Sequence, residues 1–444
     1  MSTEQDETTV AVVGMGYVGT SLSAVLAERG IRVCGIDIDT ERVEQIADGV
    51  CPVEEGAITD RFETAAEDGR ITATNEFDVV SEYQTVIVTV GTPLSESDPD
   101  LSAVESATEA IGAQLVSDQT VIYRSTLPAG TTEETVLPIL ESQAGLTVGE
   151  EFQLAFCPER MAEGSAYDDL TTTPVVVGGV TETCSESVTG FWDAVGLETY
   201  AVSSPTAAEL TKLADNWWID LNIALANEVA LLSEQLGVDA LEVIAAANTL
   251  EKGSGTVNIL YPGAGVGGSC LVKDPWFVAN LGEQHGLDLE TPRVSRRVNE
   301  RMPAHVVDML LSELPNLSGR RVAVLGYAFK TGTDDTRNTP AKPIIESLQD
   351  EGATVSVADP YVPADVIEAA IGLQPERLSE AVADVDAVVI VTGHDAYRNL
   401  EAADLVEMVG TKSFVVIDGR NVFEWDAFDD ESVTYRGVGR GSRD

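Results

Sequence analysis

The stretch Thr9–Gly19 reads TVAVVGMGYVG and decides the fold of the first part of the chain. Its first five residues, mostly apolar and β-branched, predict a buried strand that runs directly into three closely spaced glycines. A helical apolar periodicity follows and stops at Gly30. A second apolar run, Ile31–Ile36, then ends in Asp37. This order predicts a strand–helix–strand unit with a glycine-rich first turn.

The glycine-rich turn predicts a dinucleotide site, and the alternative is a purely structural tight turn. The residues concerned are Gly14, Gly16, Tyr17, Val18 and Gly19. Glycines at this spacing allow the turn, bring the backbone close to a pyrophosphate and let helix and strand pack, while the helix N-terminus favours an anion. Asp37 is placed to accept hydrogen bonds from ribose hydroxyls, which favours NAD, although Arg42 leaves NADP open.

Strand and helix patterns continue to alternate up to residue 205. Further buried strands are expected at Thr85–Val90, Thr120–Tyr123, Phe152–Phe156 and Pro174–Val177. Alternation of this kind predicts a parallel sheet covered by helices on both faces.

The pattern then changes to helix. A capping box in Thr206–Glu209 predicts the start of a long helix that ends near Gly237. Residues 238–300 are expected to be mainly helical, apart from a glycine-rich loop at Gly263–Gly268.

Alternation resumes in the last third of the chain. Strands are expected at Arg321–Leu325, Ala353–Val357, Ala387–Thr392 and Ser413–Ile417, with a helix at Ala341–Gly352. The predicted fold class is α/β, with two Rossmann-like, doubly wound parallel-sheet domains joined by a central all-α segment that contains a long helix. The expected domains are residues 1–204, 205–302 and 317–444.

The composition is strongly acidic. The 444 residues carry 75 Asp and Glu against 26 Lys and Arg, which gives a net charge of −49. Nucleic acids and anionic membranes need a basic face, so neither is expected as a partner. A hydrophobic content of 44 % is enough for packed cores, and this acidity favours a protein solvated in concentrated salt. The six lysines are Lys212, Lys252, Lys273, Lys330, Lys342 and Lys412.

Cysteine and histidine usage predicts no metal centre. The five cysteines form no C-x-x-C pair, their odd number argues against a disulfide framework, and the three histidines are dispersed. The acidic segment Met1–Thr9 does not resemble a signal peptide. No apolar run approaches the roughly 18 residues that span a bilayer. A cytoplasmic location is therefore expected.

Three segments near expected strand ends carry small hydroxyl or acidic residues. Thr92 and Pro93 lie in one turn and Ser125 and Thr126 in the next, where they either contact a ligand or make ordinary turns. Cys157–Gly164 contains Glu159 and Glu163, either a general base or part of a solvated face.

Lys212 and Asn216 are expected on one face of the long helix. An ammonium and an amide together can stabilise an oxyanion, and the alternative is an ordinary surface lysine. The glycine-rich loop has four glycines in six residues, which lets a ligand come against the backbone, and it leads to Cys270, with Lys273 and Asp274 just beyond it. A neighbouring cation lowers a thiol pKa and supplies the nucleophilic thiolate, and the alternative is a buried, inert cysteine.

Basic residues follow strand ends in the last domain. Lys330, Arg337 and Arg420 are candidates for a phosphate site, or unremarkable surface cations.

With these motifs the chain resembles the UDP-glucose/GDP-mannose dehydrogenase family from end to end. The resemblance implies an enzyme that oxidises the C6 alcohol of a UDP-sugar twice, with NAD as hydride acceptor. Cys270 would capture the intermediate aldehyde as a thiohemiacetal and then carry a thioester that water hydrolyses to the uronate. Lys212 and Asn216 would hold the oxyanion or a water, and Asp274, Thr126 and Glu159 would manage proton transfer and water activation.

The same resemblance implies the binding residues. NAD would be held by Gly14, Gly16, Tyr17, Val18, Gly19, Asp37, Arg42, Thr92, Pro93, Ser125, Thr126, Glu163, Lys273 and Arg337. The UDP-sugar would be held by Glu159, Arg160, Lys212, Asn216, Tyr261, Gly265, Gly267, Phe329, Lys330 and Arg420. The central helices would form the interface of a homodimer.

The sugar is expected from smaller features. Cys157–Arg160, Val257–Leu260, Asp274–Phe277 and Val298–Pro303 are similar to the UDP-N-acetylhexosamine branch, and to UDP-N-acetyl-D-mannosamine enzymes in particular. Ser269 and Lys273 instead follow the UDP-glucose pattern, which keeps UDP-glucose as the alternative. Thr256 stands just before Val257, where that branch has an arginine that reaches the partner's site, and Lys252 is a candidate replacement.

Two other classes compete with this interpretation. A two-electron dehydrogenase would not need Cys270 and would leave the last α/β domain unexplained. A non-catalytic NAD or nucleotide-sugar sensor would not need the acids, bases and nucleophile present.

Overall fold

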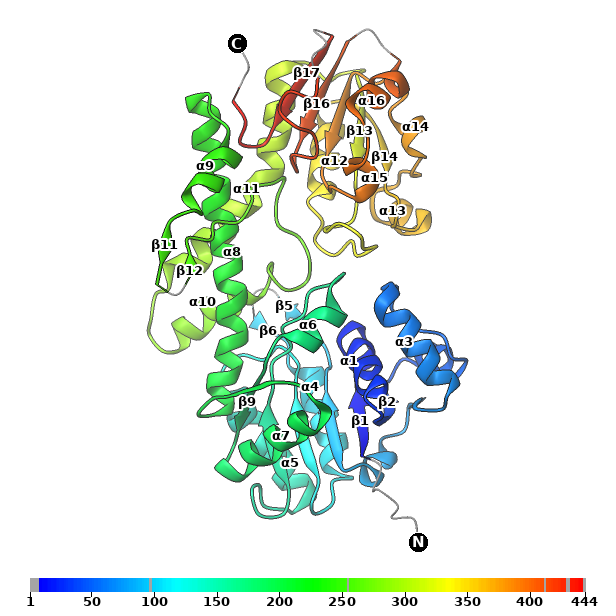
Figure 1. Cartoon of the computed structure of the whole chain (residues 1–444), viewed down its shortest axis with the longest axis vertical. Coiled ribbons are helices and arrows are strands. Elements are labelled where there is room, and N and C mark those ends of the chain that lie inside the picture. The colour runs from blue at the N-terminus through cyan, green and yellow to red at the C-terminus, as the bar shows by residue number, and fades with distance from the viewer. Residues whose placement is uncertain (1–7, 96–97, 254, 411–412, 429–431, 442–444) are drawn as a thin grey trace. The chain divides into compact units, whose positions relative to one another are not determined.

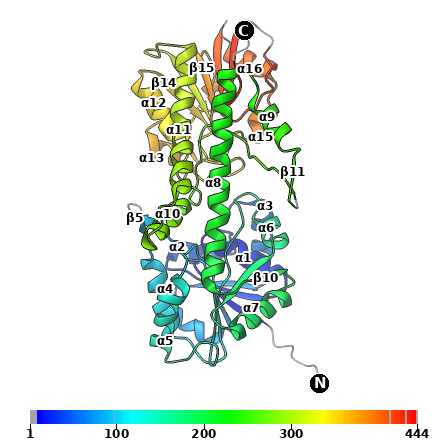
Figure 2. The ribbon, with the colours of Figure 1, turned by 90° about the vertical axis from the view of Figure 1, so that its left-hand side faces the viewer.

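The structure is a computed structural model that describes residues 8–95, 98–253, 255–410, 413–428 and 432–441. Most of Met1–Thr9 and the lysine at position 412 lie outside the described residues. The chain divides into two compact units, Met1–Asp215 and Asn216–Asp444. The division falls within α8 (Pro205–Leu236), which Figure 2 draws as one continuous helix.

The described part of the first unit contains an eight-stranded sheet in the order β10-β9-β8-β7-β4-β1-β2-β3. Its strands are β1 (Thr9–Val13), β2 (Arg32–Ile36), β3 (Ile71–Thr74), β4 (Thr85–Val88), β7 (Thr120–Tyr123), β8 (Gln153–Phe156), β9 (Val175–Gly179) and β10 (Thr199–Ala201). Its helices are α1 (Tyr17–Glu28), α2 (Thr40–Ala47), α3 (Gly56–Glu67), α4 (Ser102–Gly112), α5 (Leu137–Ala144), α6 (Ala166–Thr172) and α7 (Glu182–Val195). A small hairpin joins β5 (Leu94–Ser95) to β6 (Asp98–Pro99).

In this sheet order the six neighbouring strands β8, β7, β4, β1, β2 and β3 are parallel, as the alternating pattern predicts. The pairing of β8 with β9 is antiparallel, and this reversal was not predicted. A fully buried strand is a continuous apolar run in either direction, so periodicity does not reveal its sense.

The sheet divides the core of the first unit into two layers. On β1, Val10 and Val12 belong to one cluster, while Ala11 and Val13 belong to another, because successive strand residues face opposite sides. The first cluster includes residues of α1 and α3, and the second includes residues of α4 and α5. Figure 1 shows α1, in dark blue, alongside β1 and β2. Both faces are therefore covered, and the strand ends are left for ligands.

The predicted capping box at the start of α8 is wrong. Ser204 caps the start of α8 instead, because its Oγ accepts a hydrogen bond from the Ala207 N–H at 3.2 Å. Thr206 donates to Glu133 instead, and Glu209 turns toward residues 130–132. In a capping box Thr206 and Glu209 would each bond the backbone at the other's position. Here both side chains bond residues distant in the sequence instead.

The second unit begins with helices and ends in a sheet. The helices after α8 are α9 (Ala240–Ala247), α10 (Asp274–Gln284) and α11 (Glu290–Glu313), with a short hairpin of β11 (Glu251–Lys252) and β12 (Gly255–Thr256). The described five-stranded sheet has the order β14-β13-β15-β16-β17, all parallel. Its strands are β13 (Arg321–Leu325), β14 (Thr354–Ala358), β15 (Ala387–Ile390), β16 (Phe414–Asp418) and β17 (Val433–Gly437), and its helices are α12 (Ala341–Asp350), α13 (Ala364–Ile371), α14 (Leu378–Ala381), α15 (Asp395–Arg398) and α16 (Ala402–Val409).

The two sheets start with the same turn. Gly14 at the end of β1 has φ +94° and donates to the Ile36 carbonyl at 2.8 Å, and Gly326 at the end of β13 has φ +89° and donates to the Ala358 carbonyl at 2.8 Å. Both positions need the left-handed backbone that glycine adopts without strain. Among the described helices, none combines the length and apolar character needed to cross a bilayer.

Candidate active site

The turn after β1 leaves open space where a pyrophosphate would lie. A Cβ on Gly14 would stand 3.1 Å from the Thr89 carbonyl carbon, and one on Gly19 would overlap the Gly14 carbonyl oxygen at 2.0 Å. A Cβ on Gly16 would meet nothing within 4 Å. Two of the glycines are thus required by packing, and the middle one faces free space at the N-terminus of α1. This geometry fits a dinucleotide diphosphate.

Asp37 at the end of β2 is buried and organises the same turn. Its carboxylate accepts from the Met15 N–H at 2.6 Å, from the Asp39 N–H at 2.9 Å and from Arg42 Nη1 at 3.1 Å. Val18 lies in the first turn of α1, and the Tyr17 hydroxyl donates to Glu55 and accepts from the Gly164 N–H at 3.2 Å. Burial raises the pKa of Tyr17, so the phenol stays a donor at neutral pH.

The structure joins two of the predicted turns. The Thr92 hydroxyl, next to Pro93, donates to the Thr126 carbonyl at 2.7 Å, which links the ends of β4 and β7. The buried Ser125 hydroxyl has no hydrogen-bond partner among the described residues. Glu163 is half-buried and acts electrostatically on Tyr17. These residues lie at the carboxyl ends of parallel strands, where an open α/β sheet binds ligands.

The sequence did not point to the buried carboxylate of Glu209, which anchors a turn of the first unit. It accepts from the Gly130 N–H at 2.6 Å, the Thr132 N–H at 2.8 Å and the Thr132 hydroxyl at 2.6 Å. It therefore holds the end of the segment that begins with Ser125 and Thr126. The sequence gives one indication of Glu209, its place three residues before Lys212, but the capping-box pattern assigns it to the start of the helix.

Glu209 is expected to make stability depend on pH. Burial raises its pKa from 4.5 to about 7, so the folded protein holds this proton more tightly than the unfolded chain. The free energy of unfolding should therefore fall by about 3 kcal/mol from this group as pH rises from about 4.5 to about 7. Urea unfolding across this range should show a flatter pH dependence in Glu209→Gln than in the wild type. The exposed Glu134→Gln is the control, and an unchanged slope in Glu209→Gln would contradict the prediction.

Lys212 and Glu159 form a buried pair in the first unit. Lys212 Nζ lies 3.6 Å from Glu159 Oε2, and the two residues are 5 % and 7 % exposed. The other Glu159 oxygen accepts from the Met161 N–H. Arg160 is partly exposed and pairs with Asp215 at 2.9 Å.

A second group surrounds Asp274 at the start of α10. The Asn216 side chain donates to Asp274, and Lys273 Nζ lies 3.0 Å from its other oxygen. Cys270, half-buried, lies one turn before the helix, and its carbonyl accepts the Asp274 N–H at 2.9 Å. Thiol, carboxylate, amide and ammonium are therefore held within one short segment and the helix α8 that carries Asn216.

The glycine-rich loop before Cys270 was expected to make room for a ligand. The structure fills the space beside its glycines with residues of the same unit. A Cβ on Gly263 would lie 2.5 Å from Arg420 Nη1, one on Gly265 would lie 3.2 Å from Pro303, and one on Gly267 would lie 2.7 Å from Phe329. These glycines are needed because helix α11 and the last domain pack directly against the loop.

The predicted substrate cations have different surroundings. Arg420 is half-buried and donates to the Val391 carbonyl at 2.8 Å and the Gly265 carbonyl at 3.1 Å. Burial lowers its pKa to about 10, with a further contribution from Arg398. Lys330 is half-buried, Arg337 is exposed and paired with Asp335, and Tyr261 is 70 % exposed.

The carboxylate at the turn after β13 has a different set of partners from that of Asp37. Asp359 occupies the place of Asp37, but it accepts from the Tyr327 and Ala328 N–H groups and from His394 Nε2 at 3.1 Å, with both side chains fully buried. This arrangement does not favour a second dinucleotide of the same kind. Among the residues that the structure describes, no three His, Cys, Asp or Glu side chains cluster as metal ligands would.

The fold and these groups define an NAD-dependent oxidoreductase with two Rossmann-like domains. The chain belongs to the UDP-glucose/GDP-mannose dehydrogenase family. The NAD binding domain of that family matches residues 8–195, its central domain residues 206–301 and its UDP binding domain residues 323–425. The prediction of a nucleotide-sugar dehydrogenase is confirmed.

Similar proteins extend over almost the whole chain. The UDP-N-acetyl-D-mannosamine dehydrogenase of Pyrococcus horikoshii is 35 % identical over 97 % of this chain and 99 % of its own length. The NDP-N-acetyl-D-galactosaminuronic acid dehydrogenase of Ralstonia nicotianae is 32 % identical over 95 % of this chain and 97 % of its own. The solved structure of a UDP-glucose dehydrogenase from Pyrobaculum islandicum is 31 % identical, with a TM-score of 0.88, and covers 99 % of both chains.

Proposed function

We propose that this protein is a UDP-N-acetyl-D-mannosamine 6-dehydrogenase that forms the uronate in two NAD-dependent oxidations. The observation that carries the chemistry is Cys270 one turn ahead of Asp274, whose carboxylate contacts Asn216 and Lys273. The relatives named for UDP-N-acetyl-D-mannosamine support the sugar. UDP-glucose is the second candidate, because the Pyrobaculum islandicum structure is a UDP-glucose dehydrogenase and Ser269 follows that pattern.

The residues of the chain have distinct roles in this proposal. Bound NAD accepts one hydride in each oxidation. Cys270 adds to the aldehyde carbon, which retains the intermediate, and is released as a thiol when water cleaves the thioester. Lys212 and Asn216, one turn apart on α8, stabilise the oxyanion formed at that carbon. Asp274, Glu159 and Thr126 accept or relay the protons and orient the water.

The binding assignments also remain proposals. The NAD-binding set comprises Gly14, Gly16, Tyr17, Val18, Gly19, Asp37, Arg42, Thr92, Pro93, Ser125, Thr126, Glu163, Lys273 and Arg337. The UDP-sugar set comprises Glu159, Arg160, Lys212, Asn216, Tyr261, Gly265, Gly267, Phe329, Lys330 and Arg420. The functional division is 1–204 for NAD, 205–302 for the catalytic cysteine and 317–444 for UDP, and we assign the protein to the cytoplasm.

The test is a side-by-side assay of NADH formation from four UDP-sugars. UDP-N-acetylmannosamine, UDP-glucose, UDP-N-acetylglucosamine and UDP-galactose are compared at equal concentration in molar salt. We expect the highest kcat/KM with UDP-N-acetylmannosamine and two NADH per uronate. A preference for UDP-glucose would establish the second candidate, and one NADH per substrate would indicate a two-electron enzyme.

A homodimer is proposed from exposed apolar side chains on the central helices. Leu225, Leu232 and Leu236 follow one side of α8 at helical spacing and are 46 %, 61 % and 66 % exposed. Sedimentation analysis should give a dimer for the wild type and a monomer for Leu232→Asp with Leu236→Asp. The control is Leu287→Asp, which replaces another exposed leucine. A monomeric wild type would contradict the proposal.

Salt should affect substrate binding. A net charge of −49 repels an anionic UDP-sugar, and added salt screens that repulsion. We expect the KM for the UDP-sugar to rise as salt is lowered, measured where circular dichroism shows an intact fold. A KM that stays constant or falls would contradict this expectation.

A further inference from the structure

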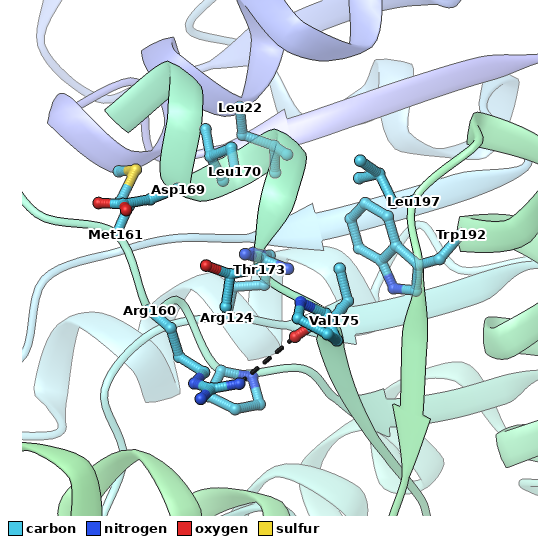
Figure 3. A pocket seen from close by; sticks show the side chains of 12 residues that line it. Leu22, Arg124, Arg160, Met161, Asp169, Leu170, Thr173, Val175, Trp192 and Leu197 are labelled. Atoms are coloured by element: carbon cyan, nitrogen blue, oxygen red, sulfur yellow. Dashed lines mark hydrogen bonds between the residues drawn. The ribbon is translucent and has the colours of Figure 1, made fainter. Parts of the chain in front are cut away.

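A small cavity of about 20 Å³ lies behind the carboxyl ends of β7 and β8 in the first unit (Figure 3). Its lining includes Arg124, Pro158, Arg160, Asp169, Pro174 and Trp192. This volume is enough for one or two particles of the size of water.

Two buried hydrogen-bond donors of the lining lack acceptors. Arg124 is 4 % exposed, and its Nε and Nη1 make no hydrogen bond among the described residues. Trp192 is fully buried, and in the described part of the chain its Nε1 has no conventional hydrogen-bond partner and only the Cys157 sulfur, a weak acceptor, beside it. The guanidinium carbon lies 5.2 Å from the indole ring centroid. Unpaired buried donors are costly, so a ligand that accepts from both would be bound favourably.

The Arg124 charge is only partly compensated, because the Glu159 carboxylate that attracts it is shared with Lys212. Burial raises the pKa of the Cys157 thiol to about 12, so this neighbour stays neutral. Glu159 is paired with Lys212, and Asp169 accepts from the Ala162 N–H and the Ser165 hydroxyl. Figure 3 shows Asp169 beside Met161, apart from Trp192. Burial lowers the pKa of Arg124 more than the attraction of Glu159 raises it, so the buried charge is incompletely compensated.

We propose that this cavity binds a chloride ion between Arg124 and Trp192. A halide accepts from several N–H donors and adds negative charge beside the guanidinium, whereas a water would add none. The other basic residue of the lining, Arg160, is neutralised by Asp215 and donates to the Pro174 carbonyl, as the dashed line in Figure 3 shows.

The ion would stiffen a segment that the proposed function uses, although its binding does not depend on which sugar is oxidised. Arg124 directly precedes Ser125 and Thr126, and Pro158 directly precedes Glu159. An anion held here joins the ends of β7 and β8 and reduces their freedom. The effect is on stability and positioning, and the ion touches no reacting atom.

The direct test is diffraction from wild-type crystals grown in bromide. An anomalous peak in the cavity, within contact distance of Arg124 and Trp192 Nε1, is expected. A water-sized peak without anomalous signal, or no peak, would overturn the proposal.

The second test compares thermal unfolding in potassium chloride and potassium gluconate at equal concentration. Chloride should raise the midpoint by at least about 3 °C, in a saturable manner. Trp192→Phe keeps the ring and removes the donor, and Arg124→Gln removes the charge, so both should lose the chloride-specific shift. The control Arg320→Gln, at an exposed ion pair, should keep it. A shift that survives in Trp192→Phe and Arg124→Gln would also overturn the proposal.

Discussion

Replacing Cys270 by alanine is expected to lower uronate formation by at least about 10³-fold. Without the thiol the aldehyde is not retained, and the second oxidation has no thiohemiacetal to act on. The first oxidation needs no thiol, so a slow single turnover to the aldehyde should remain. Quantifying NADH and uronate in the same reaction measures the change, with an expected loss of the ratio of two NADH per uronate.

Cys157→Ala is the matched control for this experiment. Cys157 is another non-disulfide cysteine, but it is fully buried and its pKa is raised, so it is not expected to react. Its replacement should leave the stoichiometry of two NADH intact. Full four-electron turnover by Cys270→Ala would reject the nucleophile, and would leave the family assignment untouched.

The second large effect is expected at the buried Lys212–Glu159 pair. Lys212→Met leaves the Glu159 carboxylate buried without its cation, which should cost about 3–5 kcal/mol of unfolding free energy. The same change removes an oxyanion donor, so kcat should fall by about 10²–10³-fold. Urea unfolding and steady-state kinetics measure the two effects.

A double variant separates structure from catalysis. Lys212→Met with Glu159→Gln removes both charges and should recover most of the lost stability, but none of the lost activity. Arg320→Gln, at an exposed pair with Asp386, should cost less than about 1 kcal/mol. If activity returned together with stability in the double variant, Lys212 would be a structural residue and not a catalytic one.

The features that depend only on residues close together in the chain could be predicted from the amino-acid sequence. The strand β1, the helix α1 and the turn between them follow from apolar periodicity and glycine spacing, and their bounds agree with the structure. Asp37 lies where the strand–turn–helix pattern places it. These features are local, because a turn with positive φ and a buried strand are encoded within about 30 residues.

Other features are decided by contacts between distant residues. Glu209 accepts hydrogen bonds from residues 130–132, Lys212 pairs with Glu159, and Asn216 donates to Asp274. Each pair is more than 50 residues apart in the sequence, and hydrophobic periodicity carries no information on contacts at that separation. The antiparallel β8–β9 pair also escaped prediction, because a buried strand has the same composition in both directions.

The glycine-rich loop shows the difference most clearly. Its glycines predict that another group lies close to the loop backbone, and only the structure identifies those groups as Phe329, Pro303 and Arg420. The unpaired donors of Arg124 and Trp192 were likewise invisible in the sequence. Whether a buried polar group has a hydrogen-bond partner depends on the three-dimensional arrangement of side chains, so it cannot be predicted from the identity of a single residue.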